Sequence, residues 1–504
     1  MTLLIRNVLI LGGAREFQEP LDLFVSGERI SAIGHFPNKK ADVVLDGQSA
    51  YLSPGFIDVN TDSDHYLSLF EHPGQEDFVK QGVTTIFGGM CGASLAPLLY
   101  GSLESIGKWT DPDKVNVNWH TMAEFLGVLD HAPLAVNFGT LAGHGTIRRA
   151  IVGESLRPLT KNEQSVFART LRAALIEGAF GMSSGLAYVH ARQTPYAELK
   201  AFTEIVKEFN GVYATHLRDT GKGVAASMEE TARLAKETGV RTLVSHFVPL
   251  KGAEKEYEAA LAEIAKLPPE MDFDFDAYLS ASTLLPIYTF LPDWAQNGGV
   301  AVMLANVNDE WFAKRAKDDM PHLDEEHFIV AQAPHNDFLV GKSLKDIKEM
   351  YGLADGREAL LRLMRTTGMR GGVLYRNVAA DLVKHALASP RSLVASNAPS
   401  FAETAFRGRQ VKSERTTRTF VDFLRLVERE HMMPLKDAIA KLTAKPAAKF
   451  GLKDRGTIAE GYYADLACFK EGEIRFVVVN GTVTAKDGSW TGARAGKALR
   501  HPAS

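Results

Sequence analysis

Two histidines and one cysteine stand where the side chains of an α/β protein can do chemistry. His216 ends the strand-like segment VYATH, and His246 ends the segment TLVSH one strand–helix unit later. Cys91 follows the segment VTTIF in the glycine-flanked turn GGMCGASLAP. Barrel enzymes place reacting groups at the carboxyl ends of their parallel strands, so the three side chains are expected to meet at one rim. A thiolate and two imidazoles suit zinc and leave its fourth position open for water.

Each of these residues also has an ordinary structural interpretation. A single cysteine is often a small buried apolar residue, and a histidine at a strand end often only completes hydrogen bonds. The combination of three is more specific than any one member. If the trio binds zinc, the metal lowers the pKa of its bound water to about 7 and polarises a carbonyl group.

A second group of polar side chains follows the apolar segment FIDV, which begins at Phe56. Asn60, Asp62, Asp64 and His65 come in quick succession directly after this segment. Such a pattern is typical of a buried strand whose end opens into an active site. A carboxylate at that strand end can accept a proton or bind a metal.

The elements that must position these residues are eight strand-like segments separated by helical stretches. The apolar segments lie at 56–59, 83–87, 134–138, 179–183, 212–216, 241–246, 271–275 and 392–396. Between two of them, Thr160 and Glu163 have the spacing of a capping box at the start of a helix with one apolar face. Eight alternating units favour a (β/α)8 barrel over an open, doubly wound sheet. No glycine-rich phosphate loop follows any of these segments, which also weighs against a nucleotide-binding sheet.

The two ends of the chain have a different texture, with short strand-like segments broken by glycine and proline. Residues 1–55 and 455–504 both show it, and Asn480-Gly481 is typical of a hairpin turn. Neither half is large enough to bury a core alone, so we expect one small β domain completed by both ends. Residues 56–454 then form the barrel. An insertion over the barrel mouth is expected at about 284–345, because this stretch is too long for a simple connection.

The composition is that of an ordinary soluble enzyme. In 504 residues the hydrophobic fraction is 45%, the charged fraction is 23% and the formal net charge is −4. Neither nucleic acid nor a membrane is therefore expected as a partner. The apolar N-terminal stretch lacks a basic region and a cleavage site, and no run is long enough to span a bilayer. With Cys91 and Cys468 as the only cysteines, a disulfide framework is excluded, and a cytoplasmic protein is expected.

Longer motifs resemble one known family. The similarity to the N-acyl-D-amino-acid deacylases (D-aminoacylases) of the amidohydrolase superfamily runs in order through LSPGFIDVNTDSD, QGVTTIFGGMCGASLAP, LAGHGTIR, GMSSGLAY, GVYATHLRD, LPDWAQNGG, GLKDRGTIAEGYYADLACF and VNGTVTAKDGSWTGARAGKALR. The resemblance covers nearly the whole chain. It implies a metal-bearing barrel beside a small β-sandwich made from both termini, and hydrolysis of an amide C–N bond by a zinc-activated water. The family's tight metal site maps onto Cys91, His216 and His246.

The sequence departs from the family pattern at positions close to the chemistry. The superfamily's first strand ends in His-x-His, whereas this chain has Asn60 and Asp62. The family's acid/base aspartate, in a Ser-Asp pair on the last strand, is replaced by Asn397 in VASNAPS. Near the arginine that should bind the substrate carboxylate, this chain has Arg407 and Arg409 within an altered motif. Because an amide and a carboxylate suit zinc poorly, we expect one tightly bound zinc ion, and Asp62 is either a displaced base or a solvated acid.

The leading hypothesis is a zinc-dependent amidohydrolase that cleaves a small N-acyl-D-amino acid or a related linear amide, with Tyr188, Tyr278 and Arg407 as substrate-binding candidates. A cyclic-amide hydrolase similar to dihydropyrimidinases is disfavoured, because such enzymes bridge two metals with a modified lysine and GAFGMSSG on the fourth strand has none. A third hypothesis is a catalytically impaired homologue with a binding or scaffolding role. Its support is Asn397, because an amide cannot take a proton and general acid–base catalysis is worth ~10²–10⁴-fold.

Overall fold

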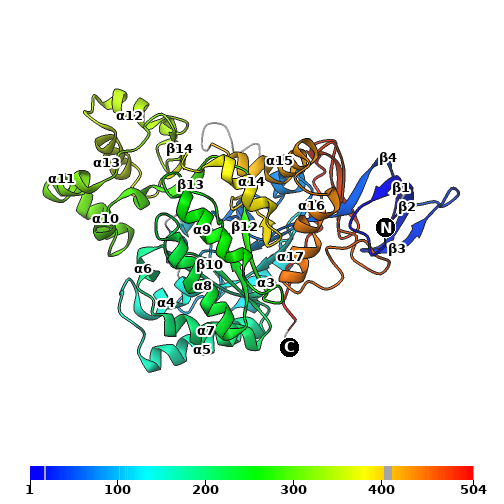
Figure 1. Cartoon of the computed structure of the whole chain (residues 1–504), viewed down its shortest axis with the longest axis horizontal. Helices are drawn as coiled ribbons and strands as arrows, with labels where there is room; N and C mark the ends of the chain where they lie inside the picture. The colour runs from blue at the N-terminus through cyan, green and yellow to red at the C-terminus, as the bar shows by residue number, and fades with distance from the viewer. Residues whose placement is uncertain are drawn as a thin grey trace.

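A (β/α)8 barrel forms the centre of the molecule (Figure 1). The computed structural model describes residues 1–15, 17, 19–101, 103–107, 109–110, 112–401 and 411–502. In chain order the barrel strands are β5 (Phe56–Asp58), β6 (Val83–Gly88), β7 (Asn137–Thr140) continued by β8 (Ala142–Gly143), β9 (Gly181–Gly185), β10 (Val212–His216), β11 (Arg241–Val244), β12 (Phe273–Ala277) and β16 (Ser392–Val394). Neighbouring strands pair in parallel. All eight predicted segments overlap a barrel strand, so the predicted barrel is confirmed.

The ring of strands closes between β16 and β5. Just beyond these strands, the backbone N–H of Asn397 donates to the carbonyl of Asn60 at 2.8 Å, and the N–H of Asp62 donates to the carbonyl of Ala398 at 3.2 Å. These two bonds bring the end of the last strand against the end of the first. The polar residues after both strands therefore share one rim of the barrel.

Helices connect the strands and cover the outside of the barrel. They are α3 (Met122–His131), α4 (His144–Val152), α5 (Lys161–Ile176), α7 (Tyr196–Glu208), α8 (Val224–Thr238), α9 (Glu254–Ala265), α14 (Ala380–Ala388), α15 (Glu414–Glu430), α16 (Leu435–Leu442) and α17 (Ala444–Lys449), with the short α1 (Ser68–Glu71), α2 (Glu76–Val79) and α6 (Val189–Arg192). The predicted capping box of α5 is present, since the Thr160 hydroxyl accepts from the N–H of Glu163 and the Glu163 carboxylate accepts from the N–H of Thr160. The buried face of α5, which includes Phe167 and Leu171, belongs to the main core cluster.

Both ends of the chain contribute to one eight-stranded sheet beside the barrel. Its strands lie in the order β20 (Ser489–Trp490), β19 (Thr482–Lys486), β18 (Glu473–Val479), β17 (Leu466–Lys470), β4 (Val43–Pro54), β1 (Thr2–Ile10), β2 (Leu21–Ser26) and β3 (Arg29–Gly34). The junction of the two halves is the antiparallel pair β4–β17, in which Ser53 lies opposite Ala467. Apolar side chains from both halves, such as Leu52 and Phe476, form one buried cluster. The predicted fold class, a barrel with an additional β domain, is confirmed.

A third unit lies between β12 and β16 in the sequence and has a core of its own. It contains the sheet β13 (Thr283–Pro286), β15 (Gly372–Tyr375) and β14 (Phe328–Gln332), and the helices α10 (Gly299–Asn308), α11 (Glu310–Asp319), α12 (Leu344–Tyr351) and α13 (Gly356–Thr366). Its separate apolar cluster runs from Ile287 to Val373. The predicted insertion of 284–345 therefore ends too early, because β15 returns to pair with β13.

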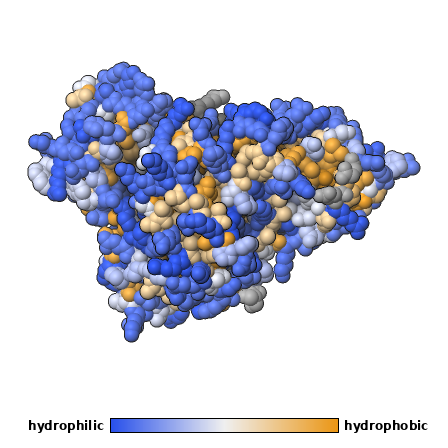
Figure 2. All heavy atoms as spheres, in the orientation of Figure 1, coloured by the Kyte–Doolittle hydropathy of each residue, from blue (hydrophilic) through white to orange (hydrophobic). Residues whose placement is uncertain are grey.

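The terminal sheet and the helices α10–α13 lie at opposite ends of the barrel in Figure 1. Hydrophilic residues dominate the face of the molecule shown in Figure 2. Among the described helices, none combines the length and the apolar character that crossing a membrane requires.

Candidate active site

A cavity of about 310 Å³ opens at the carboxyl ends of the barrel strands. The polar and aromatic side chains that line it include Asp62, Cys91, Tyr188, His216, His246, Tyr278, Asn397 and Arg415. The structure thus brings together the predicted metal ligands, the catalytic candidates Asp62 and Asn397, and the substrate-binding candidates Tyr188 and Tyr278. The remaining candidate, Arg407, lies outside the described residues.

The ligand atoms of Cys91, His216 and His246 lie within 4.8 Å of one another. The Cys91 sulfur is 3.3 Å from Nε2 of His246, and the rings of the two histidines meet edge to face with centroids 4.2 Å apart. Ligands bound to tetrahedral zinc at its usual bond lengths are separated by roughly 3.3–3.8 Å. Burial lowers the pKa of His246 to about 4, so its imidazole is neutral and able to bind a metal. Within the described residues, this is the cluster of three or more Cys, His, Asp or Glu side chains whose geometry fits an ion.

Backbone strain accompanies the site residues. Cys91, His246 and Asn397 all have positive φ angles, of 52°, 38° and 44°. Residues other than glycine rarely adopt this left-handed conformation, which costs about 1–3 kcal/mol for each. After Cys91 the chain needs Gly92, because a Cβ atom there would lie 2.7 Å from the backbone nitrogen of Gly185. The strained turns are therefore held by their surroundings, which pre-organise the side chains that point into the cavity.

Buried carboxylates accept hydrogen bonds from the backbone of two of these turns. Asp276, at the end of β12, accepts a hydrogen bond from the backbone N–H of His246 at 2.8 Å. Asp58, at the end of β5, accepts from the backbone N–H of Ser396 beside Asn397. Burial raises the pKa of Asp276 to about 7 and that of Asp58 to about 8. Neither was identified from the sequence, because an acid inside an apolar strand segment does not reveal which backbone groups it will meet.

Asn60 does not line the cavity. Its side-chain nitrogen donates to Asp276 at 3.2 Å, and its backbone carbonyl accepts from Asn397. The sequence placed Asn60 and Asp62 together at the position of a second metal. The structure separates them, since the amide of Asn60 is turned toward Asp276 and the carboxylate of Asp62 lines the cavity.

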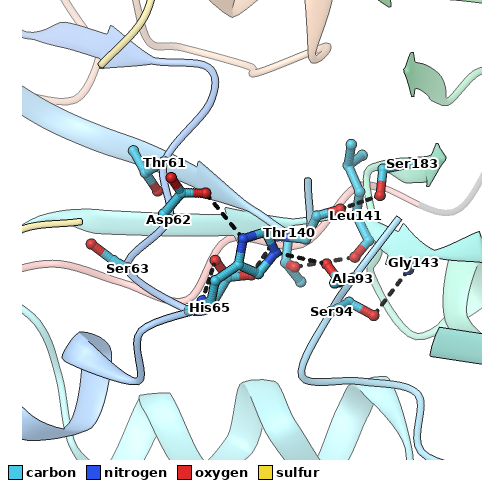
Figure 3. A network of polar contacts seen from close by, with 12 residues as sticks. Thr61, Asp62, Ser63, His65, Ala93, Ser94, Thr140, Leu141, Gly143 and Ser183 are labelled. Atoms are coloured by element: carbon cyan, nitrogen blue, oxygen red, sulfur yellow. Dashed lines mark hydrogen bonds and ion pairs between the residues drawn. The ribbon is translucent and has the colours of Figure 1, made fainter. Parts of the chain in front are cut away.

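Asp62 is held by a residue to which the sequence assigned no role. Nδ1 of His65 lies 3.0 Å from Oδ1 of Asp62, and His65 is completely buried (Figure 3). Burial opposes ionisation of Asp62, but its hydrogen bond with His65 and the nearby positive charges outweigh burial and lower its pKa. The carboxylate at the cavity wall is therefore ionised and can accept a proton.

Arg415 is the second functional candidate that the sequence missed. It follows the Ser413 N-cap of α15, is 1% exposed, and its guanidinium lies 4.3 Å from the ring centre of Tyr278. Its Nε and Nη2 have no hydrogen-bond partner among the described residues. A buried guanidinium that lines a cavity with unused donors is suited to bind an anion.

The rest of the cavity is largely apolar. Its lining includes Leu217, Val224, Phe247, Val248, Leu250, Leu284, Leu285, Pro286 and Phe290. A second cation, Arg192, also lines it but forms an ion pair with Asp293. The ring of Tyr188, which also lines the cavity, has its centre 5.2 Å from that of His216. Within the described lining, Arg415 is thus the arginine whose charge is not balanced by an ion pair.

Comparison with known proteins places this geometry in context. Residues 120–484 match the model of the amidohydrolase family. The chain is 27% identical to a D-aminoacylase from Alcaligenes xylosoxydans xylosoxydans, over 99% of this chain and 98% of that protein.

Solved structures show the same similarity. A crystal structure of N-acyl-D-glutamate deacylase from Bordetella bronchiseptica, complexed with zinc and a phosphonate inhibitor that mimics the tetrahedral intermediate, matches with a TM-score of 0.81. The sequence identity is 25%, and the match covers 99% of each chain. A D-hydantoinase (dihydropyrimidinase) from Thermus sp. matches with a TM-score of 0.55 at 16% identity and covers 99% of each chain, which shows a shared fold alone.

Proposed function

Because the chain belongs to the amidohydrolase family, we propose that it hydrolyses the amide bond of an N-acyl-D-amino acid with the help of one zinc ion. The observation that carries this proposal is the presence of two complementary groups in one cavity. Cys91, His216 and His246 can hold the metal, and Arg415 offers unused donors for a carboxylate. An N-acyl amino acid presents an amide carbonyl and a carboxylate only a few bonds apart.

The donor set determines what zinc would supply. Bound by Cys91, His216 and His246, the ion would acidify a water molecule and polarise the amide carbonyl. Asn60 is turned away from the cavity, and Asp62 is bonded to His65, so we propose a single tightly bound ion.

The chain's own residues carry the binding and the proton transfer. Arg415 binds the carboxylate of the substrate and so fixes its acyl group near the three metal ligands. As the water oxygen bonds to the acyl carbon, Asp62 takes a proton from that water and then gives it to the amine nitrogen when the C–N bond breaks. Asn397 cannot take this role, because an amide does not accept a proton at neutral pH. Tyr188 and Tyr278 contribute aromatic surface to the cavity.

The lining also indicates which D-amino acid fits. Apolar residues such as Leu217, Phe247 and Leu285 surround the cavity, and Arg192 is neutralised by Asp293. A second carboxylate in the substrate side chain would lose its hydration without gaining an unpaired cation. We therefore propose that N-acyl derivatives of apolar D-amino acids are better substrates than those of D-aspartate or D-glutamate.

Two other hypotheses remain from the sequence. A cyclic-amide hydrolase would need a modified lysine that bridges two metals. This chain has no lysine in β9, which reads GMSSG. A catalytically impaired homologue rests on Asn397 alone, and Asp62 supplies the cavity with a carboxylate. Cys91 and Cys468 are buried and are not joined in a disulfide, which agrees with a cytoplasmic location as part of this proposal.

The proposal is tested with purified, zinc-loaded protein and paired substrates. We expect N-acetyl-D-leucine to be hydrolysed to acetate and D-leucine, N-acetyl-L-leucine to be a poor substrate, and N-acetyl-D-aspartate to be slower than the leucine derivative. Metal analysis should give about one zinc per chain. Full zinc occupancy with no hydrolysis of any N-acyl-D-amino acid in a broad panel would support the impaired homologue instead.

A further inference from the structure

His65 lies at the centre of a buried network that connects Asp62 with the turn carrying Cys91. Its Nδ1 is 3.0 Å from Oδ1 of Asp62, and its Nε2 is 3.1 Å from the carbonyl oxygen of Ala93. Figure 3 shows the ring lying between the two, with Asp62 on one side and Ala93 on the other. Ala93 is two residues beyond Cys91. One imidazole therefore links the proposed base to the segment that carries the proposed metal ligand Cys91.

The two hydrogen-bond partners of the His65 ring determine which of its nitrogens carry a hydrogen. The carbonyl of Ala93 only accepts, so Nε2 must carry a hydrogen. A neutral ring would then leave Nδ1 bare against an ionised carboxylate, and no hydrogen bond would form at 3.0 Å. The contact therefore needs one more hydrogen, and the lowered pKa of Asp62 together with the raised pKa of His65 places it on the ring. Burial alone would lower the pKa of His65, but the charge of Asp64 and the bond to Asp62 outweigh it and raise this pKa.

The ring cannot easily rotate away from this position. The indole of Trp109 stacks on it with centroids 4.3 Å apart and planes inclined by 7°. Asp64 fixes the local backbone, because its carboxylate accepts from the N–H of His65 at 2.9 Å and from the N–H of Gly89 at 2.6 Å. The exposed fraction of the His65 side chain is 0%, whereas that of Asp62 is 13%. Only the carboxylate of the pair can reach a bound substrate.

We propose that His65 is a positioning residue that holds Asp62 with one carboxylate oxygen bonded to the imidazole and the other free to transfer a proton in the cavity. The inference rests on the proposed hydrolysis of an N-acyl amino acid. In the reaction, the free oxygen of Asp62 accepts the proton of the attacking water and passes it to the leaving amine nitrogen. The imidazole keeps both of its hydrogens throughout. Its fixed positive charge keeps the carboxylate ionised between turnovers.

The test uses two substitutions of His65 that differ in which hydrogen bond they keep. The side-chain nitrogen of asparagine can take the place of Nδ1, so His65→Asn retains a donor to Asp62. The longer His65→Gln reaches the place of Nε2 and retains only the contact with Ala93. We expect His65→Gln to lower kcat about 10–100-fold with KM and zinc content unchanged. His65→Asn should keep most of the wild-type kcat. Equal losses in both variants would overturn the proposal.

A double-mutant cycle separates positioning from a general structural effect. Because His65 acts through Asp62, His65→Gln should cost nothing further in an Asp62→Asn background, and the double variant should match Asp62→Asn alone. Additive losses would contradict the proposal. The matched control is His144→Gln, since His144 is also fully buried and lies 3.3 Å from the Glu198 carboxylate, away from the cavity. We expect this control to change stability but not kcat.

A measurement without substrate tests the pair independently of the proposed reaction. Nitrogen NMR of histidine-labelled, zinc-loaded protein should show hydrogens on both ring nitrogens of His65, and on one only in the Asp62→Asn variant. The signal is assigned by its loss in His65→Gln. A wild-type ring with a single hydrogen overturns the proposed pairing. Two hydrogens in a protein that hydrolyses no N-acyl-D-amino acid would leave the pairing in place and refute the proposed substrate class.

Discussion

Replacing Arg415 with methionine should weaken substrate binding without destabilising the fold. Arg415 is 1% exposed, and its Nε and Nη2 have no partner among the described residues. Two charge-assisted hydrogen bonds to a substrate carboxylate would each contribute about 1.5–3 kcal/mol net. Their loss amounts to about 3–6 kcal/mol, or ~10²–10⁴-fold in kcat/KM. Since the carboxylate does not change during the reaction, most of this loss should appear in KM.

The same substitution should leave the melting temperature equal to that of the wild type or raise it. In the free protein Arg415 contributes its packing and its contact with the Tyr278 ring at 4.3 Å, but it satisfies no ion pair with a carboxylate. Methionine is an unbranched, shorter apolar side chain with no charge to keep buried, and burying a charge without an ion-pair partner costs free energy that methionine avoids. Stability and affinity should therefore change in opposite directions or independently.

The assay compares N-acetyl-D-leucine with N-acetyl-D-leucinamide, which lacks the carboxylate. The wild type should strongly prefer the acid, and Arg415→Met should treat the two alike, with little change toward the amide. A variant that keeps its kcat/KM for the acid refutes the assignment of Arg415. Equal losses toward both substrates, or a large drop in melting temperature, would mean that the arginine supports the structure of the site.

Three further outcomes are expected. Cys91→Ala should remove most of the bound zinc, as measured by metal analysis after dialysis, and unchanged occupancy would contradict the proposed trio. If Asp62 carries the proton, Asp62→Asn should lower kcat by ~10²–10⁴-fold and Asn397→Asp should change it less than about tenfold; a rise of about 10²-fold in Asn397→Asp would assign the base to position 397. Deleting residues 1–50 should make the protein insoluble, because it removes β1, β2 and β3 and leaves the rest of β4, residues 51–54 paired with β17, as an open edge, and a soluble, cooperatively folding truncation would count against a shared β domain.

The barrel and the clustering of Cys91, His216 and His246 could be predicted because their signals are local. An apolar strand segment followed by a histidine, as at His216 and His246, indicates both the element and the rim to which the side chain belongs. Cys91 likewise follows an apolar strand segment, in a glycine-flanked turn. Parallel strands in a closed barrel then bring the three together without further information.

Arg415 and His65 could not be assigned because their roles depend on loop geometry. The altered motif directed attention to Arg407, whereas the arginine in the described cavity follows the point where Ser413 caps α15. His65 was visible beside Asp62, but its function depends on a ring orientation set by Trp109, a residue far away in the sequence. The extent of the insertion was missed for a related reason, since β15 pairs with β13 across a whole subdomain.

Because β4 pairs with β17, one edge of β4 stays unpaired until almost the whole chain has been synthesised. Ser53 and Ala467 are joined across this pair although they lie 414 positions apart. At ~5–20 residues per second, a ribosome needs about 20–80 s to add the intervening chain. During that time the edge of β4 that later meets β17 has no partner, and open edges recruit other chains. A ribosome that stalls late in the synthesis of the barrel would therefore release a product that contains most of the barrel and an unpaired edge of β4 that can bind other chains.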